Sequence, residues 1–280
     1  MMHLWLFYFI LMAVSFSGVA MMNSCITVEK EPVTEEEGST YDQGEVTISV
    51  VYDNYIFSRE LASGWGFGCV IDTPQGTMLF DTGGDSDALL ANMESMGIDP
   101  GAMDTVVLSH IHGDHTGGLA GFLKVNSDVE VLIPVSFPDS MRSGIEASGA
   151  SYRDVSEPVR ISGPVYTTGE MGTGIREQSL ILDTDRGLAV ITGCAHAGIM
   201  KILERSGEIF PGRTIHLCMG GFHLLSSSDS ELRNIIRGFR EMGVEKVAPS
   251  HCSGDRCREL FREEYGDDFI ESGAGKKIGL

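Results

Sequence analysis

The sequence has few basic residues. Only 20 lysines and arginines stand against 40 aspartates and glutamates among 280 residues, which gives a formal net charge of -20. A surface this acidic repels phosphate backbones, so we expect no nucleic-acid partner. The 35 glycines show no three-residue period, which excludes a collagen-like chain, and there is no long internal repeat. Hydrophobic residues make up 42% of the chain, enough for the core of one large domain or two small ones.

Long hydrophobic runs are also scarce, and the clearest one lies at the N-terminus, from Leu4 to Met22. It carries no charge, and about 20 such residues can span a bilayer as a helix. At this position the run predicts a signal peptide, a lipoprotein signal with an acylated Cys25, or a membrane anchor over residues 1–25. We therefore expect an exported protein with a membrane tether. A start at Met21 or Met22 is the alternative and would leave the protein cytoplasmic.

Residues 26–44 are acidic, contain Pro32 and Gly38, and lack hydrophobic periodicity. This composition predicts a solvated linker that precedes a globular domain over residues 45–280.

Residues 45–280 show alternating strand and helix patterns. β-Branched and apolar runs predict strands at 46–52, 66–72, 77–80, 105–108, 130–133, 179–182, 188–192, 214–219 and 246–249. Helical spacing of apolar residues predicts helices at 86–96, 118–124, 197–205, 230–242 and 255–265. The stretch 136–177 has the least regular pattern. In each half of residues 45–280, predicted hairpins come first and alternating strands and helices follow. This order favours an α/β or α+β sandwich of two sheets between helical layers.

Histidine is rare, with eight residues, yet three of them fall within six positions. His110, His112 and His115 surround Asp114, directly after an apolar strand and within a glycine-rich turn. In an extended segment His110 and His112 point to the same side and can hold one metal ion. Asp114 and His115 follow the turn and can hold a second. Neutral imidazole and carboxylate together suit a borderline-soft divalent cation.

Three further histidines each follow a predicted apolar strand: His196, His223 and His251. Taken singly, each is as readily a hydrogen-bonded structural histidine as a ligand. Because all three stand at strand ends, they can converge with the first cluster at one edge of a pair of sheets.

The motif HIHGDHTGG at 110–118 resembles the HxHxDH signature of the metallo-β-lactamase superfamily. LFDTGG at 79–84 and VAPSHCSG at 247–254 resemble its earlier aspartate motif and its final histidine motif. The resemblance covers nearly all of residues 46–280 and implies a four-layer αββα sandwich. It also implies two divalent metal ions, with Asp81 orienting a ligand histidine. The implied metal ligands are His110, His112, Asp114, His115, His196 and His251.

Several shorter motifs narrow the resemblance to one branch. YDN at 52–54, ITGCAHAGI at 191–199 and GGFHL at 220–224 resemble the branch named after 7,8-dihydropterin-6-methyl-4-(β-D-ribofuranosyl)aminobenzene-5′-phosphate synthase of methanopterin biosynthesis. Many superfamily members carry a bridging aspartate in a strand motif resembling FTGD, whereas here Cys194 takes that position. A thiolate is a good zinc ligand, but cysteine is also a common small core residue. Cys194 therefore stays an open candidate ligand, and His196 is favoured.

These features predict a metal-dependent hydrolase that uses a metal-bound hydroxide on a small-molecule phosphate ester, diphosphate or related substrate. Asp114 and His223 are the expected catalytic residues, with His223 binding substrate or acting as a general acid. Zinc is the favoured metal, with manganese or iron as alternatives. Two other functions stay open: a dihydropterin synthase-type transferase that displaces diphosphate, and a non-catalytic, membrane-tethered metal-binding protein.

Cys252 and Cys257 could pair in an oxidising compartment, but the sequence does not define the connectivity.

Overall fold

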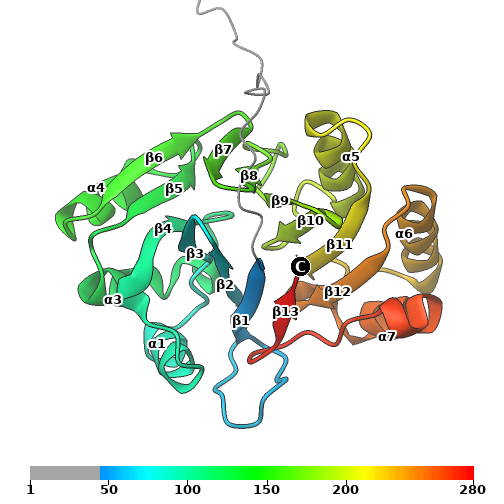
Figure 1. Ribbon diagram of the computed structural model, residues 1–280, viewed down its shortest axis with the longest axis horizontal. Coiled ribbons are helices and arrows are strands. Elements are labelled where there is room, and N and C mark those ends of the chain that lie inside the picture. The colour runs from blue at the N-terminus through cyan, green and yellow to red at the C-terminus, as the bar shows by residue number, and fades with distance from the viewer. Residues whose placement is uncertain (1–44) are drawn as a thin grey trace, which may run out of the picture. The chain divides into compact units, whose positions relative to one another are not determined.

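Two β-sheets pack face to face in the computed structural model, which describes residues 45–280 (Figure 1). The first sheet has the strand order β13-β1-β2-β3-β4-β5-β6, and the second has the order β12-β11-β10-β9-β8-β7. The strands of the first sheet are β1 (Thr47–Asp53), β2 (Phe67–Thr73), β3 (Gly76–Phe80), β4 (Met103–Val107), β5 (Glu130–Pro134), β6 (Ser151–Val155) and β13 (Lys277–Gly279). Those of the second are β7 (Val159–Ser162), β8 (Val165–Thr167), β9 (Leu180–Thr184), β10 (Gly187–Thr192), β11 (Ile215–Gly221) and β12 (Lys246–Ser250).

Helices cover the outer face of each sheet. Figure 1 shows α1 (Ser86–Ser95), α3 (Leu119–Val125) and α4 (Asp139–Ala147) outside the first sheet, and α5 (Ile199–Ile209), α6 (Asp229–Glu241) and α7 (Asp255–Tyr265) outside the second. One helical turn, α2 (Gly113–Thr116), and three 3₁₀ turns complete the set: η1 (Pro100–Ala102), η2 (His251–Ser253) and η3 (Gly266–Asp268). The predicted αββα sandwich is confirmed.

The alternation of side chains along the strands creates three apolar layers. In β2, Cys69 and Ile71 pack between the sheets, whereas Val70 packs with the helices on the outer face. In β10, Ile191 points into the central layer and Val190 into the outer layer under α5 and α6. Because successive side chains of a strand point to opposite faces, strands buried on both sides read as continuous apolar runs. This explains why the central strands were recognisable in the sequence.

Helix α6 begins at a capping box. The Ser228 side chain accepts from the Glu231 backbone N–H, and the Glu231 carboxylate accepts from the Ser228 backbone N–H. The buried face of the helix places Leu232, Ile236 and Phe239 against the second sheet and α7. The sequence predicted this helix over nearly the same residues because both its cap and its apolar face are local patterns.

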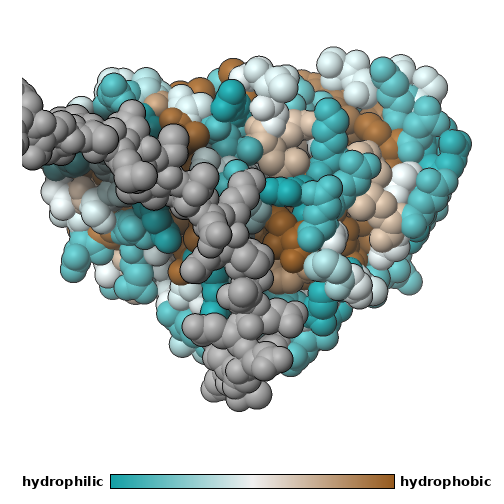
Figure 2. Space-filling view, turned by 90° about the horizontal axis from the view of Figure 1, so that it is seen from above, coloured by the Kyte–Doolittle hydropathy of each residue, from teal (hydrophilic) through white to brown (hydrophobic). Residues whose placement is uncertain are grey.

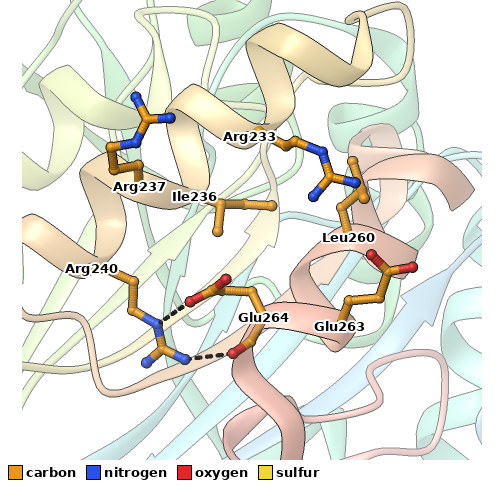
Figure 3. A pocket seen from close by; sticks show the side chains of 7 residues that line it. All are labelled: Arg233, Ile236, Arg237, Arg240, Leu260, Glu263 and Glu264. Atoms are coloured by element: carbon orange, nitrogen blue, oxygen red, sulfur yellow. Dashed lines mark hydrogen bonds and ion pairs between the residues drawn. The ribbon is translucent and has the colours of Figure 1, made fainter.

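A hollow of about 540 Å³ lies between α6 and α7 on the outside of the molecule (Figure 3). It is walled by charged side chains from both helices, and Arg240 bridges them through Glu264, with Nε 3.2 Å from the carboxylate Oε1 and Nη2 2.7 Å from the backbone oxygen. None of the predicted site residues lines it.

Figure 2 shows one face of the molecule on which hydrophilic side chains surround smaller hydrophobic patches.

The structure differs from the sequence prediction mainly between residues 136 and 177. This stretch contains α4, β6, β7 and β8 rather than irregular chain. β7 is half-buried and reads Val-Arg-Ile-Ser, an alternation of only four residues, and β8 has only three, so both strands give a weak signal in the sequence. The three-residue strand β13, which pairs with β1, was also missed, and the helix expected at 197–205 runs from Ile199 to Ile209.

The predicted signal or anchor over residues 1–25 and the linker over 26–44 lie outside the described residues, and both remain predictions. Within residues 45–280, no helix is long and apolar enough to cross a bilayer.

Replacing Phe239 by alanine should strongly destabilise the second sheet's outer layer. Phe239 is fully buried, with its ring 5.6 Å from that of Phe222 and 5.1 Å from that of Phe261. We expect the free energy of unfolding, measured by urea titration, to fall by about 3–5 kcal/mol. Val125→Ala is the control, because Val125 is 57% exposed, and it should change the value by about 0.5 kcal/mol or less. Equal losses in the two variants would contradict this packing.

Candidate metal centre

The candidate site lies where five strands end. β3 and β4 are parallel neighbours in the first sheet, and β10, β11 and β12 are parallel neighbours in the second. Parallel neighbours bring their carboxyl ends to the same edge of a sheet. The residues that follow these five ends include all the predicted site residues: Asp81, His110, His112, Asp114, His115, Cys194, His196, His223 and His251.

The backbone turns sharply at four of these ends. Within residues 45–280, the non-glycine residues with positive φ are Asp81 (56°), Ala195 (60°), His223 (56°) and His251 (46°). Each such conformation costs about 1–3 kcal/mol and persists only where the surroundings fix it. All four follow β3, β10, β11 or β12 within three residues, so the strain is concentrated at the candidate site.

The fully buried Asp81 carboxylate connects two of the histidines. Its Oδ2 accepts from His115 Nδ1 at 2.7 Å and from Ser109 Oγ at 2.7 Å, and its Oδ1 accepts from the Ser109 backbone N–H at 2.7 Å. Because the Ser109 hydroxyl donates to Asp81, it accepts from His110 Nδ1, which lies 2.8 Å away. The Nδ1 atoms of His110 and His115 therefore carry protons, and their Nε2 atoms present lone pairs.

His251 is fixed in the same way from the other sheet. Its Nδ1 donates to Asn54 Oδ1 at 2.8 Å, so its Nε2 also presents a lone pair. That atom lies 3.3 Å from His115 Nε2 and 3.4 Å from Asp114 Oδ2. Two lone pairs and a carboxylate oxygen cannot hydrogen-bond to one another, whereas a cation among them would satisfy all three.

A second group of imidazoles lies beside the first. His110 Nε2 is 3.1 Å from His112 Nδ1, and the His196 ring lies 4.7 Å from that of His110 and 4.9 Å from that of His112. The Nε2 of His196 is buried without a hydrogen-bond partner among the described residues. Buried polar atoms are rarely left unpaired, so this nitrogen also fits a missing cation.

Cys194 lies between the two groups. Its Sγ belongs to one cluster with His110 and His196 and to another with His115 and His251, and the ligand atoms of each cluster lie within 4.8 Å of one another. Its sulfur is 3.2 Å from His115 Nε2. Thiolate and imidazole are preferred zinc ligands. The donor set therefore fits two divalent ions with Cys194 in the position that both can reach.

The charges of the site also suit cation binding. Burial and the neighbouring imidazoles of His223 and His112 lower the pKa of His196 to about 4, so this ring is neutral at pH 7. Burial would raise the pKa of Asp114, but the neighbouring imidazoles of His251 and His115 lower it to about 2. Neutral imidazole and ionised carboxylate are the forms that bind metals.

His223 has a different environment from the other histidines. Its side chain is exposed, and its ring lies 4.3 Å from that of His196 at a tilt of 53°. A hydrogen bond to the Cys252 sulfur raises the pKa of His223. The contact with Cys194 lowers the pKa of the Cys252 thiol to about 5. His223 can therefore hold a proton at the mouth of the site.

Glu177 is a site residue that sequence reasoning missed. It is buried, and its carboxylate accepts three consecutive backbone N–H groups, those of Cys194 and Ala195 through Oε1 and that of His196 through Oε2, at 2.8–2.9 Å. These bonds hold the strained turn that aims Cys194 and His196 at the site. Glu177 lies in a segment without any regular pattern, so nothing in the sequence marked it.

The sequence analysis also did not predict the supporting role of three other residues, Ser109, Asn54 and Asp53. Ser109 and Asn54 orient His110 and His251, and Asp53 accepts a hydrogen bond from the Ser250 hydroxyl next to His251. Asp53 and Asn54 belong to the YDN motif, and Ser109 directly precedes the histidine cluster. Their positions were therefore visible in the sequence, although their partners were not.

Replacing Glu177 by glutamine should weaken both the fold and metal binding. The amide offers only one acceptor oxygen, so at least one buried N–H of the turn loses its partner, at a cost of about 1–3 kcal/mol. We expect a lower urea midpoint and a lower zinc content after dialysis. Glu157→Gln is the matched control, because the Glu157 side chain is 67% exposed. Unchanged zinc binding in Glu177→Gln would show that the turn does not need this carboxylate.

Comparisons with known proteins agree with this architecture. The family model of the metallo-beta-lactamase superfamily matches residues 69–251. A solved metal-dependent hydrolase of the beta-lactamase superfamily is 30% identical, with a TM-score of 0.72 over 84% of this chain and 99% of that one. A diphosphatase of the PhnP family shares the fold at 13% identity, with a TM-score of 0.57 over 84% of this chain and 97% of that one.

A curated relative comes from Methanocaldococcus jannaschii. It is named 7,8-dihydropterin-6-methyl-4-(beta-D-ribofuranosyl)-aminobenzene-5'-phosphate synthase and is 29% identical over 245 residues, which cover 72% of this chain and 83% of the relative. The matched family model spans the aspartate motif, the histidine cluster and the final histidine, the same residues that meet at the strand ends. With its two sheets, its helical outer layers and these motifs, the chain belongs to the metallo-β-lactamase superfamily.

Proposed function

We propose that the protein is a metal-dependent hydrolase of small phosphate esters, diphosphates or related compounds. One observation carries the proposal: the Nε2 lone pairs of His115 and His251 face each other at 3.3 Å beside the Asp114 carboxylate. The Asp114 side chain is 22% exposed, so the site is open to solvent rather than closed by protein ligands. Catalytic metal sites keep an open position, whereas structural sites do not.

The residues divide into two ligand groups. His110, His112 and His196 form one, and Asp114, His115 and His251 form the other, with Cys194 within reach of both. Two divalent ions bound there, which we propose are zinc because of the imidazole and thiolate donors, would supply positive charge that polarises a phosphoryl oxygen and acidifies water.

Proton transfer falls to two side chains at the opening. The ionised Asp114 carboxylate can accept a hydrogen bond from an attacking water and so orient it. The contact with Cys252 raises the pKa of His223, which favours this ring as the donor of a proton to the oxygen of the leaving group.

An exposed aromatic side chain, Trp65, lies next to the candidate site. This indole is 52% exposed, and its ring lies 4.8 Å from that of His251. Large exposed aromatic side chains next to a polar site commonly bind ligand rings. Trp65 therefore favours a substrate that carries an aromatic or heterocyclic group beside its phosphate.

Replacing His112 by alanine should remove metal and activity together. We expect the zinc content, measured by mass spectrometry of metals after dialysis, to fall by about half, and hydrolysis of a generic phosphodiester to fall at least 100-fold, a loss of about 2.7 kcal/mol or more in transition-state stabilisation.

His216→Ala is the matched control for this experiment. His216 is a histidine outside the site, bound through Nδ1 to Glu245 at 2.7 Å. It should keep wild-type zinc content and activity. Full zinc content and full turnover in His112→Ala would overturn the proposed centre.

A pterin-forming transferase is the second candidate, and the relatedness to the Methanocaldococcus jannaschii synthase favours it. In this reaction the same cations would stabilise a departing diphosphate while an arylamine attacks a pterin methyl carbon. The exposed face of Trp65 beside the site is a suitable platform for a pterin ring.

A substrate panel separates the two reactions. The zinc-loaded protein should release p-nitrophenol from a p-nitrophenyl phosphodiester if it is a hydrolase. A transferase should instead release diphosphate from a hydroxymethyl-dihydropterin diphosphate only when an arylamine is present. Release of diphosphate that requires the amine, without phosphodiester hydrolysis, would reject the hydrolase in favour of the transferase.

A further inference from the structure

Cys194 and Cys252 face each other beside the candidate metal centre. Their Sγ atoms are 3.3 Å apart, and Cys252 Sγ also lies 3.6 Å from the Cys194 backbone oxygen. Both residues are buried, with 3% and 5% of their surface exposed. Cys194 follows β10 and Cys252 follows β12, so the fold brings together two thiols that are 58 residues apart in the chain.

A glycine makes room for this pair. A Cβ atom on Gly221, at the end of β11 between the two strands, would lie only 2.7 Å from Cys252 Sγ. Any side chain there would push the Cys252 sulfur away from its present position. The absence of a side chain at residue 221 therefore permits the close approach of the two thiols.

The other described cysteines have no comparable neighbour. Cys69, Cys218 and Cys257 are free and packed among apolar side chains, Cys69 between the sheets and the other two under the helices of the second sheet. The pairing of Cys252 with Cys257 that the sequence left open is not formed, because Cys257 points into the core under α7. Among residues 45–280, only Cys194 and Cys252 have sulfur atoms in contact.

We propose that Cys194 and Cys252 form a redox-active dithiol that a hydroperoxide closes to a disulfide, and that this closure releases metal from the centre. The disulfide itself follows from the geometry of the two sulfurs. Its effect on metal rests on the proposed metal centre, in which Cys194 Sγ lies 3.2 Å from His115 Nε2.

The oxidation balances with hydrogen peroxide as the oxidant. The sulfur of one cysteine attacks a peroxide oxygen, the O–O bond breaks, and a sulfenic acid and one water form. The second thiol then attacks the sulfenic sulfur, the S–S bond forms, and the hydroxyl group leaves as a second water with the thiol proton. Two thiols lose two electrons in total, and the peroxide is reduced to two water molecules. Peroxide is small enough to reach a pair that is nearly buried.

Closure must move the sulfur of Cys194 or Cys252. A disulfide bond is about 2.05 Å long, so the two sulfurs must approach by more than about 1 Å. The backbone of the turn at Cys194 is held by Glu177. A sulfur in a disulfide is no longer a thiolate donor. Conversely, a cation bound to Cys194 should protect the pair from oxidation.

The first test uses the full-length wild-type chain and needs no variant. Metal is removed with a chelator, the protein is treated with hydrogen peroxide, and unreduced proteolytic peptides are analysed by mass spectrometry. We expect a cross-linked peptide pair containing Cys194 and Cys252, with the loss of two hydrogens, that separates after addition of dithiothreitol. Circular dichroism checks that the chain remains folded. Free Cys194 and Cys252 after oxidation of the folded chain would overturn the proposal.

Two variants test the specificity of the cross-link. Cys252→Ala should abolish it, whereas Cys257→Ala, a buried cysteine five residues away, should retain it. Equal cross-linking of Cys194 to Cys218 or Cys257 in the wild-type chain would contradict a dedicated pair.

The metal arm compares zinc-loaded and zinc-free protein. Zinc should slow formation of the cross-link at least tenfold, and oxidised protein should retain less zinc until dithiothreitol restores binding. A disulfide that forms at the same rate with zinc bound and leaves the zinc content unchanged would overturn the link to metal. This outcome is distinguishable from failure of the metal centre itself, in which the reduced protein would bind no zinc.

Discussion

The Asp81 carboxylate is the interaction on which the site depends. It is buried, and its two oxygens accept from His115 and from both the backbone and the hydroxyl of Ser109, which in turn accepts from His110. One residue at the end of β3 thereby fixes the tautomers of two histidines from the neighbouring strand end. Hydrogen bonds of this kind set the ring orientation and raise the basicity of a ligand imidazole.

In this arrangement, bound cations would link folding to metal binding. Three features of the site raise the free energy of the folded chain. The lone pairs of His115 and His251 face each other at 3.3 Å, and a His196 nitrogen has no hydrogen-bond partner among residues 45–280. The backbone is also strained at four strand ends. Cations shared among these groups would relieve the electrostatic part of this cost, since binding energy at such sites adds to the free energy of folding. Glu177 and Asn54 support the candidate ligands through hydrogen bonds to the turn at Cys194–His196 and to His251.

Local patterns predicted much of the fold and the identity of the candidate ligands. Helix α6 was recognisable from its cap and apolar face, and the central strands from their apolar runs. The strands β7 and β8 of the stretch 136–177 were missed because they have only four and three residues. The separate strand β13 was missed for the same reason, since it has only three. Glu177 was missed because a buried carboxylate in an irregular segment has the same appearance in sequence as an exposed one.

The sequence by itself determined the superfamily, the strand ends that carry histidines and the acidic character of the chain. These properties depend on residue type and on spacing along one segment. Only the tertiary structure decided that Cys194 lies between two groups of candidate ligands and that Glu177 holds the turn. It also decided that the sulfur of Cys252 contacts Cys194 and not Cys257. These contacts join separate strand ends and loops, so they exist only after the two sheets have packed and brought those segments together.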